Sequence, residues 1–139
     1  MSKLDEKIRN IAVVIIKHND RILVSPNYDE EKDWHFFRLL GGGIEFRESA
    51  QEALEREIKE ELGREIVNIS LLEVSENIFQ YQKRLGHEIC FIFKADFKDK
   101  ADYNIEEFQI LDQPKRKAIW VKLNEENRKN ITPIIKSNY

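Results

Sequence analysis

The sequence predicts a mixed α/β fold in which helices pack on a central mixed β-sheet. Strand candidates lie on both sides of one long helical segment, residues 49–62, and a second helix signal comes late in the chain, at Asn124. Elements with one apolar face must bury it against another element, so this order places the helices on the sheet. The chain has 139 residues, of which 41% are hydrophobic, and this suits a single domain, residues 1–139.

Three strands are expected before the central helix. The run NIAVVIIKHNDRILVSP, residues 10–26, contains two apolar segments around the polar turn 18–20. A polar loop, residues 28–33, separates them from WHFFRLL, residues 34–40. This aromatic stretch predicts a third strand that runs into the glycines 41–43.

The central helix carries its own boundary signals. Ser49, followed three positions later by Glu52, forms a capping-box pattern, and Gly63 suits a C-terminal cap. Apolar residues at helical spacing form one stripe, which we expect to pack on the sheet: Leu54, Ile58 and Leu62.

Strands resume after the helix. The candidates are residues 69–81, 87–97 and 118–123. The first two flank a turn at 82–86, the charged residues 98–117 predict a loop, and Asn124 can cap a C-terminal helix. Cys90, in the apolar run EICFIF, is expected to be a small buried side chain of a strand.

The net charge of the chain is concentrated in one segment. The formal net charge is -3, and residues 41–64 hold seven acids and four bases, which also sum to -3. The remaining residues hold 19 acids and 19 bases. A general nucleic-acid-binding surface needs a basic excess, so this distribution argues against one and favours a cation site.

Three further observations restrict the class of protein. A single cysteine cannot form an internal disulfide, and the N-terminal MSKLDEK is not followed by the apolar region of a signal peptide. The run IAVVII is too short to span a bilayer. We therefore expect a cytoplasmic protein that has no membrane partner.

The central helix places three acids together. At about 100° of rotation per residue, Glu57, Glu60 and Glu61 share a face with the small residues Ala50 and Ala53. Glu57 has acids three and four positions on, and each like-charge pair costs about 0.2–0.5 kcal/mol on an exposed helix. A hard divalent cation binds carboxylate oxygens and would offset this repulsion.

Other interpretations of these charges exist. On the outer face Glu52 has Arg56 four residues on, and Glu55 has Lys59 at the same spacing, so those charges form helix ion pairs. The crowded acids could then belong to an ordinary solvated helix. A structural calcium site is disfavoured, because calcium loops draw oxygens from alternate residues of a loop and not from a helix face.

The spacing around these acids is similar to a known signature. Its fixed positions are Gly42, Glu48, Arg56, Glu57, Glu60, Glu61 and Gly63. This stretch, residues 42–64, resembles the Nudix box of the Nudix hydrolases, and the strand order on either side is similar to that family's. The resemblance implies an α/β/α sandwich. Two positions depart from it: Arg64 stands where an apolar residue usually ends the box, a place that Ile66 can take, and Leu40 stands where proline is common.

The resemblance implies a hydrolase that cleaves a nucleoside diphosphate linked to another group, by attack of water on phosphorus with Mg²⁺ or Mn²⁺ as cofactor. The implied metal ligands are Glu57, Glu60 and Glu61, with the carbonyl of Gly41 or Gly42. Arg56 is expected to pair with Glu48 and to hold the loop against the helix. The expected catalytic residues are thus Glu48, Arg56, Glu57 and Glu60.

The general base stays open among several acids. Clustered carboxylates raise one another's proton affinity whereas a bound metal lowers it, so the sequence does not name the base. Glu57 is one candidate. Acids beyond the helix are others: Glu88, Glu106 and Glu107. Each of these three, taken singly, is more simply explained as a solvated charge of a loop or strand edge.

The expected substrate contacts are Arg38 for a phosphate, and Phe36 and Tyr81 for a base. Strand aromatics are usually core residues, so we expect at most two of the five available ones to face substrate: Tyr28, Trp34, Phe36, Phe37 and Tyr81. In the family, a tyrosine past the box is associated with dinucleoside polyphosphate hydrolases and a proline there with ADP-ribose hydrolases. Tyr81 therefore favours the former.

A second class of function is a Nudix-like fold that senses a nucleotide without cutting it. Such modules typically lose box acids, and all of them are present here. The expected partner is thus a small nucleotide rather than a nucleic acid, and a homodimer stays open. His35 and His87 lack metal-ligand spacing and are expected to be structural.

Overall fold

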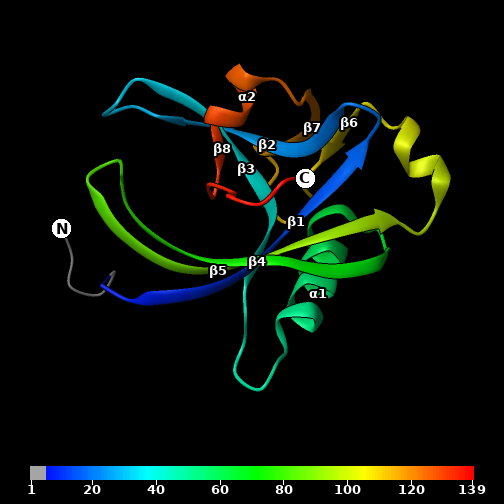
Figure 1. The fold of residues 1–139 in the computed structure, drawn as a ribbon, viewed down its shortest axis with the longest axis horizontal. Helices are drawn as coiled ribbons and strands as arrows, with labels where there is room; N and C mark the ends of the chain where they lie inside the picture. The colour runs from blue at the N-terminus through cyan, green and yellow to red at the C-terminus, as the bar shows by residue number, and fades with distance from the viewer. Residues whose placement is uncertain (1–5) are drawn as a thin grey trace.

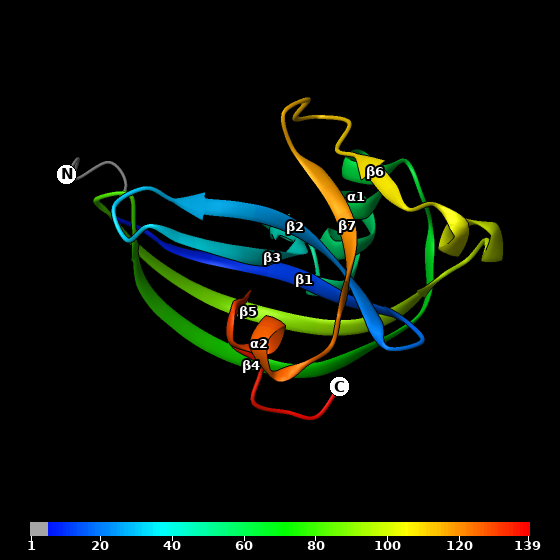
Figure 2. The same ribbon diagram turned by 90° about the horizontal axis from the view of Figure 1, so that it is seen from above.

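Strand β1 (Ile8–His18) lies in the middle of a mixed sheet in the computed structural model, which describes residues 6–139. The other strands are β2 (Arg21–Asp29), β3 (Trp34–Gly43), β4 (Ile66–Tyr81), β5 (Arg84–Phe97), β6 (Glu107–Gln109), β7 (Lys117–Lys122) and β8 (Ile131–Thr132). The order across the sheet is β4-β5-β1-β3-β2-β7-β6, with β8 paired to β3, and Figure 2 shows the first five of these strands side by side. The sheet is mixed because β1 runs parallel to β5 and antiparallel to β3.

Two helices complete the fold, and the predicted mixed α/β architecture is confirmed. Helix α1 (Ala50–Leu62) packs against β3, β1 and β4, and the short α2 (Glu125–Lys129) follows β7. Figure 1 shows the two helices separated by β1, with α1 on one side and the C-terminal segment on the other. In the part of the chain from residue 6 onward, neither helix is long and apolar enough to cross a membrane.

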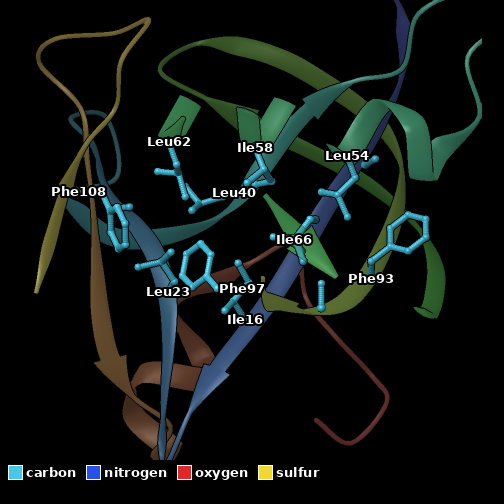
Figure 3. Packing of buried hydrophobic residues seen from close by; sticks show 14 of the residues in the cluster. Ile16, Leu23, Leu40, Leu54, Ile58, Leu62, Ile66, Phe93, Phe97 and Phe108 are labelled. Atoms are coloured by element: carbon cyan, nitrogen blue, oxygen red, sulfur yellow. The ribbon is translucent and has the colours of Figure 1, made fainter. Parts of the chain in front are cut away.

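The core has two halves, one on each face of β1. Alternate side chains of β1 point to opposite faces, so Ala12, Val14 and Ile16 pack toward α1 while Ile11, Val13 and Ile15 pack toward the C-terminal segment. The predicted stripe of α1 fills the first half, where Leu54, Ile58 and Leu62 meet the side chains shown in Figure 3. Burying each such side chain contributes about 1.5–3 kcal/mol, so the stripe fixes which face of α1 stays outside the core. Cys90 is fully buried in the second half, as predicted.

Helix α1 begins and ends as the sequence predicts. The Ser49 side chain accepts a hydrogen bond from the Glu52 backbone N–H at 3.1 Å, and the Glu52 side chain accepts one from the Ser49 N–H at 3.0 Å. Gly63 takes a left-handed conformation, with φ of 68°, which costs a glycine little. Both ends of α1 are therefore determined by residues next to them in the sequence.

The hairpin of β4 and β5 is longer than predicted. Its turn consists of Gln82 and Lys83 alone, both with positive φ, and β5 already begins at Arg84. A two-residue turn of this kind matches the right-handed twist of long antiparallel strands. The expected five-residue turn at 82–86 was wrong because neither central residue is a typical residue for positive φ.

Residues 98–117 are not simply a loop. They contain the 3₁₀ helix η2 (Lys100–Asn104) and β6, which pairs with β7. Asp102 of η2 is buried and receives a hydrogen bond from Arg64 at 2.8 Å. This bond accounts for the departure at Arg64, while Ile66 occupies the apolar position beside it in the core.

The C-terminal segment begins with a confirmed cap. The Asn124 side chain accepts a hydrogen bond from the Asn127 N–H at 2.8 Å and starts α2. Strand β8 was not predicted, because two residues carry no periodicity and their pairing with β3 joins positions far apart in the sequence.

The ion pair between Arg64 and Asp102 generates a prediction. Arg64→Ala leaves the buried Asp102 carboxylate without this partner and should lower the free energy of unfolding by about 1–3 kcal/mol, measured by urea denaturation. Asp102→Asn in the same background removes the uncompensated charge and should recover part of that loss. Wild-type stability in the single variant would show that the pair does not stabilise the fold.

Candidate active site

The three crowded acids of α1 line a pocket, here called the acid pocket, of about 490 Å³. Its walls come from α1, from the end of β3, from the loop between β6 and β7, and from two arginines of the sheet. The polar residues and glycines around it are Gly41, Gly42, Gly43, Glu57, Glu60, Glu61, Asp112, Gln113, Arg116, Arg9, Arg38 and Asn27. The sequence-predicted acids therefore face one shared cavity.

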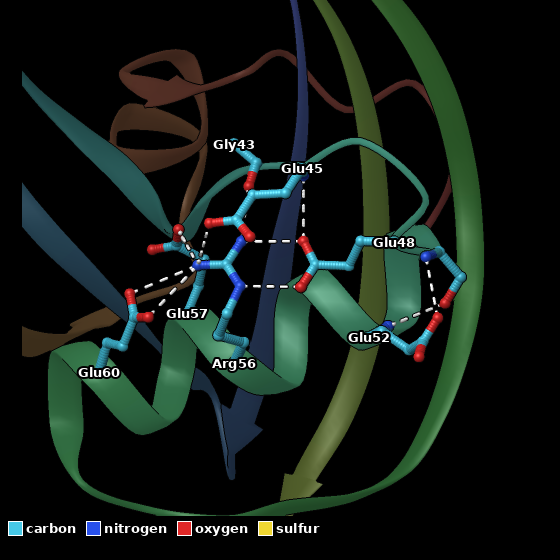
Figure 4. Close-up of polar contacts among 8 residues, drawn as sticks. Gly43, Glu45, Glu48, Glu52, Arg56, Glu57 and Glu60 are labelled. Carbon is cyan, nitrogen blue, oxygen red and sulfur yellow. Dashed lines mark hydrogen bonds and ion pairs between the residues drawn. The ribbon is translucent and has the colours of Figure 1, made fainter.

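Arg56 is the centre of the hydrogen-bond network beside this pocket (Figure 4). Its Nε and Nη2 donate to the two carboxylate oxygens of Glu48 at 2.8 and 2.9 Å, the two-pronged geometry that suits arginine best. Nη2 also donates to the Gly43 carbonyl at 2.9 Å. The expected pairing of Arg56 with Glu48 is thus observed, and it ties the loop before α1 to the helix.

The same guanidinium contacts the acidic face. Arg56 Nη1 donates to Glu57 Oε1 at 3.0 Å and lies 3.4 Å from both oxygens of Glu60. The ion pairs predicted within the helix, Glu52 with Arg56 and Glu55 with Lys59, are not the ones formed. Arg56 contacts Glu57 and Glu60, while Glu52 caps the helix. Lys59 lies 3.7 Å from Glu65. Hydrogen bonds from Arg56 and the Glu45 backbone hold the pKa of Glu48 at about 2.

Glu57 lies between the helix and the glycines of β3. Its side chain is 16% exposed, and burial is the main cause that raises its pKa, with Arg56 acting in the opposite direction. A Cβ atom added to Gly42 would lie 2.5 Å from the Glu57 carboxyl carbon. Glycine at position 42 is therefore required for α1 to bring this carboxylate so close to the strand.

Glu61 is the most buried of the three acids, and Glu60 is the most exposed. Glu61 is 4% exposed and accepts a hydrogen bond from the Gly41 N–H at 3.1 Å. Its pKa is raised to about 8, mainly by burial, with Arg116 acting in the opposite direction and Glu57 and Asp112 adding to the rise. Glu60 is about half exposed. The pocket thus holds carboxylates whose negative charge is poorly compensated by the protein.

The donor set fits a hard divalent cation. Carboxylates, backbone carbonyls and room for water are what Mg²⁺ and Mn²⁺ bind. Within residues 6–139, no three side chains of the ligating types are already drawn together as a closed cage. In this arrangement Glu57 is turned to Arg56 and Glu61 to the Gly41 amide. Burial makes the charged forms of Glu57 and Glu61 costly, and a bound cation would offset that cost.

Sequence reasoning missed the second wall of the pocket. Asp112, Gln113 and Arg116 come from the loop between β6 and β7, which the Leu111 N–H attaches to the Glu61 carbonyl at 2.8 Å. Arg116 donates to the Gln113 side chain at 3.2 Å, and its Nε is buried without a hydrogen-bond partner. No spacing signal links this loop to α1, because some 50 residues separate them.

Two of the acids considered as a general base, Glu106 and Glu107, lie away from the acid pocket. Glu107 lies 3.2 Å from Lys117, and Glu106 lines a surface pocket with His18 and Trp120, so neither borders the acid pocket. Asp112 is the acid of that stretch that does. Arg116, from the same loop, brings a base to the pocket in addition to Arg56 beside it.

An aromatic pocket of about 420 Å³ adjoins the acid pocket. Of the five aromatics considered, Trp34, Phe36 and Tyr81 line it, together with Phe79. Trp34 stacks on Phe36 at 4.5 Å between ring centroids, and Tyr81 meets Phe36 edge-on at 5.8 Å. The two remaining aromatics lie elsewhere: Phe37 packs on the core and Tyr28 is exposed.

Arg38 joins the two pockets. Arg38 lines both of them, as does Asn27, so they form one continuous cleft. Glu88 is buried and lies 3.8 Å from Arg38. The interpretation of Glu88 as a solvated strand-edge charge was therefore wrong. His35 and His87 have structural contacts, with the Tyr28 ring at 4.4 Å and with Glu76 at 2.9 Å respectively.

Comparison with known proteins identifies the family. The model of the NUDIX domain matches residues 7–138, nearly the whole chain. The chain belongs to the Nudix hydrolase family. Most of the acids of the acid pocket belong to residues 42–64, the stretch whose spacing resembles the Nudix box.

Solved Nudix structures share the fold. The MutT NUDIX hydrolase from Burkholderia pseudomallei has a TM-score of 0.63 at 23% identity, over 90% of this chain and 96% of that one. The NUDIX hydrolase from Nitrosomonas europaea has a TM-score of 0.60 at 17% identity, over 94% and 82% of the two chains. A curated relative, the RNA pyrophosphohydrolase of Teredinibacter turnerae, is 29% identical over 73 residues. That match covers 52% of this chain but only 41% of the relative's length.

The burial of Glu61 predicts a pH dependence in the metal-free protein. The folded state keeps a proton on Glu61 up to about pH 8, whereas the unfolded state releases it near the ordinary value of 4.5. The free energy of unfolding should therefore fall as pH rises through this window. Glu61→Gln removes this contribution and should be more stable than wild type at pH 8, by on the order of 1 kcal/mol or more.

The measurement is urea denaturation in excess EDTA at pH 5 and pH 8. Glu55→Gln, on the exposed outer face of α1, is the matched control and should follow the wild-type pH profile. If Glu61→Gln is no more stable than wild type at pH 8, the carboxylate is not strained in the fold.

Proposed function

We propose that this protein hydrolyses the diphosphate linkage of a nucleoside diphosphate attached to a second group, by attack of water on phosphorus. The observation that carries the proposal is the single cleft in which the Nudix-box acids, two arginines and an aromatic pocket meet. A phosphate chain can lie at the acids while its base lies among the aromatic rings.

Glu57, Glu60 and Glu61, with the carbonyl of Gly41 or Gly42, are the residues that would hold Mg²⁺ or Mn²⁺. When bound, the cation neutralises phosphate oxygens and lowers the pKa of water. This role accounts for a half-buried carboxylate, Glu57, and a buried one, Glu61, in the same pocket.

The arginines and acids around the acid pocket have distinct proposed roles. Arg56 fixes the carboxylate of Glu57 and, through Glu48, the loop before the helix. Arg38 would contact a phosphate from the opposite wall of the cleft. Glu57 can accept the proton of the attacking water, and Asp112, in the same pocket, is a further candidate for this role.

The aromatic pocket supports a substrate with a base. Tyr81 is held in place by its hydroxyl, which donates to the Tyr28 carbonyl at 3.1 Å, so its ring is oriented before any ligand arrives. Together with Phe36 it can stack a nucleobase. The proposed substrate is a nucleotide with two or more linked phosphates, of which a dinucleoside polyphosphate is favoured. The curated relative is named for RNA, so an RNA 5′ end belongs in the comparison.

Metal removal tests the proposed reaction. Purified protein is assayed with Mg²⁺ or Mn²⁺ against a dinucleoside polyphosphate, ADP-ribose, a sugar nucleotide, an oxidised nucleoside triphosphate and 5′-triphosphorylated RNA, with products identified by chromatography. Cleavage of a diphosphate linkage should occur with metal and stop in excess EDTA. Undiminished turnover in EDTA would remove the proposed mechanism, and tight nucleotide binding without turnover would indicate a sensing module.

Substitution of Glu57 tests its assignment. Glu57→Gln should lower turnover by orders of magnitude, because it removes a metal contact and a candidate base. Melting in EDTA should stay at or slightly above the wild-type temperature, because a half-buried charge beside Glu60 is lost. Glu55→Gln, on the exposed face, is the matched control and should retain turnover. Equal damage from the two variants would contradict the assignment.

A further inference from the structure

A third hollow, here called the basic groove, adjoins both pockets. It has a volume of about 430 Å³ and is lined by the bases Lys7, Arg9, Arg38, Arg84 and His87. Among its lining residues within 6–139, Glu88 is the one acid. Counting histidine as neutral, the lining residues that the structure describes, four bases and one acid, sum to a formal charge of +3, although the whole chain carries -3.

Strand pairing brings these charges together. In the parallel pair of β1 and β5, Ile8 is opposite His87 and Arg9 is opposite Glu88, which sets the start of one strand beside the start of the other. Arg38 comes from β3, on the other side of β1. Distant parts of the sequence therefore make one positive surface. The sequence does not reveal it, because acids and bases are equal in number outside the Nudix box.

Glu88 positions two of the arginines without neutralising both. The carboxylate lies 3.7 Å from Arg9 Nη1 and 3.8 Å from Arg38 Nη2. Glu88 is buried, whereas 60% of the Arg9 side chain and 33% of the Arg38 side chain are exposed. One buried carboxylate facing two guanidiniums leaves a net positive charge directed at solvent, as a site for anions requires.

The groove is continuous with the proposed reaction site. Arg9 and Arg38 also line the acid pocket, and Phe79 and Tyr81 also line the aromatic pocket. The Phe79 ring lies against Gly86, where an added Cβ would overlap it, so a glycine is needed for this ring position. An anion that leaves the acid pocket past the two arginines enters the basic groove directly.

We propose that the basic groove is a second anion-binding subsite, which takes the phosphate groups of a small nucleotide substrate that lie beyond the scissile linkage. This inference rests on the proposed function. A substrate with an extended phosphate chain would fill both the acid pocket and the groove, whereas one with a neutral sugar beyond the diphosphate would leave the groove without its charge partner. The guanidiniums of Arg9 and Arg38 suit phosphate oxygens, which they can bind in pairs.

Binding of inorganic tripolyphosphate in excess EDTA tests the subsite apart from catalysis. Without divalent cations the acids have no bridging cation through which to hold a phosphate, so the difference in binding between wild type and a variant changed only in the groove, measured by calorimetry, reports on the groove. Lys7→Gln/Arg84→Gln removes two charges that line the groove and neither of the other two pockets. The dissociation constant should rise about 3- to 10-fold in this double variant, and wild-type binding should weaken with added salt.

Two further variants serve as controls. Lys98→Gln removes an exposed charge just beyond the other end of β5, where Lys98 lies 3.2 Å from Glu65, and should bind tripolyphosphate as wild type does. Lys7→Gln alone, a change at an exposed position, should give part of the effect and guards against misfolding of the double variant. Absence of tripolyphosphate binding, or equal binding by wild type and the double variant, would overturn the proposal.

Steady-state kinetics and competition binding identify the ligand of the basic groove. For Lys7→Gln/Arg84→Gln, the KM of a dinucleoside tetraphosphate should rise several-fold more than that of ADP-ribose, with kcat little changed for either. The dinucleotide should also displace tripolyphosphate. Displacement only by a 5′-phosphorylated oligoribonucleotide would assign the groove to nucleic acid and overturn the small-substrate proposal. If no nucleotide is hydrolysed while tripolyphosphate binding depends on Lys7 and Arg84, the proposed function fails and the anion subsite stands.

Discussion

The Arg56 guanidinium is the contact on which the rest of the site depends. It binds both oxygens of Glu48, the carbonyl of Gly43 and an oxygen of Glu57, so one cation connects the loop, the end of β3 and the acidic face of α1. A glycine at position 42 is the steric counterpart of this network, since it lets the Glu57 carboxylate lie against the strand. Both act on Glu57, whereas Glu61 is held separately by the Gly41 N–H.

The cleft has an uneven distribution of charge, which follows from how it is built. Helix α1 supplies carboxylates to one wall, of which Glu61 is almost fully buried. The sheet supplies Arg9 and Arg38 to the facing wall, where Glu88 lies between them. Negative and positive surfaces thus meet along one continuous cavity. A phosphate chain accompanied by a divalent cation has the matching pattern, because the cation suits the acids and the free phosphate oxygens suit the arginines.

Local sequence signals predicted the ends of α1 and its acidic face correctly, but they did not predict its ion pairs. The cap at Ser49, the end at Gly63 and the shared face of three acids depend only on spacings of three and four residues. The ion partners on the same helix were less predictable. Arg56 turns inward to Glu48 and Glu57, and Lys59 lies near Glu65, because packing of the helix on the sheet brings partners that compete with the nearest charge in sequence.

The sequence by itself determined the fold class, the Nudix box, the burial of Cys90 and the pairing of Glu48 with Arg56, because these follow from periodicity or from a motif within one continuous segment. Only the tertiary structure decided which distant residues join the site. Asp112 and Arg116 reach the acids through a loop that hydrogen-bonds to the end of α1, and Arg9 meets Glu88 through parallel pairing of β1 with β5. Pairing of this kind depends on how strands far apart in the chain align, and no spacing along the sequence encodes that alignment.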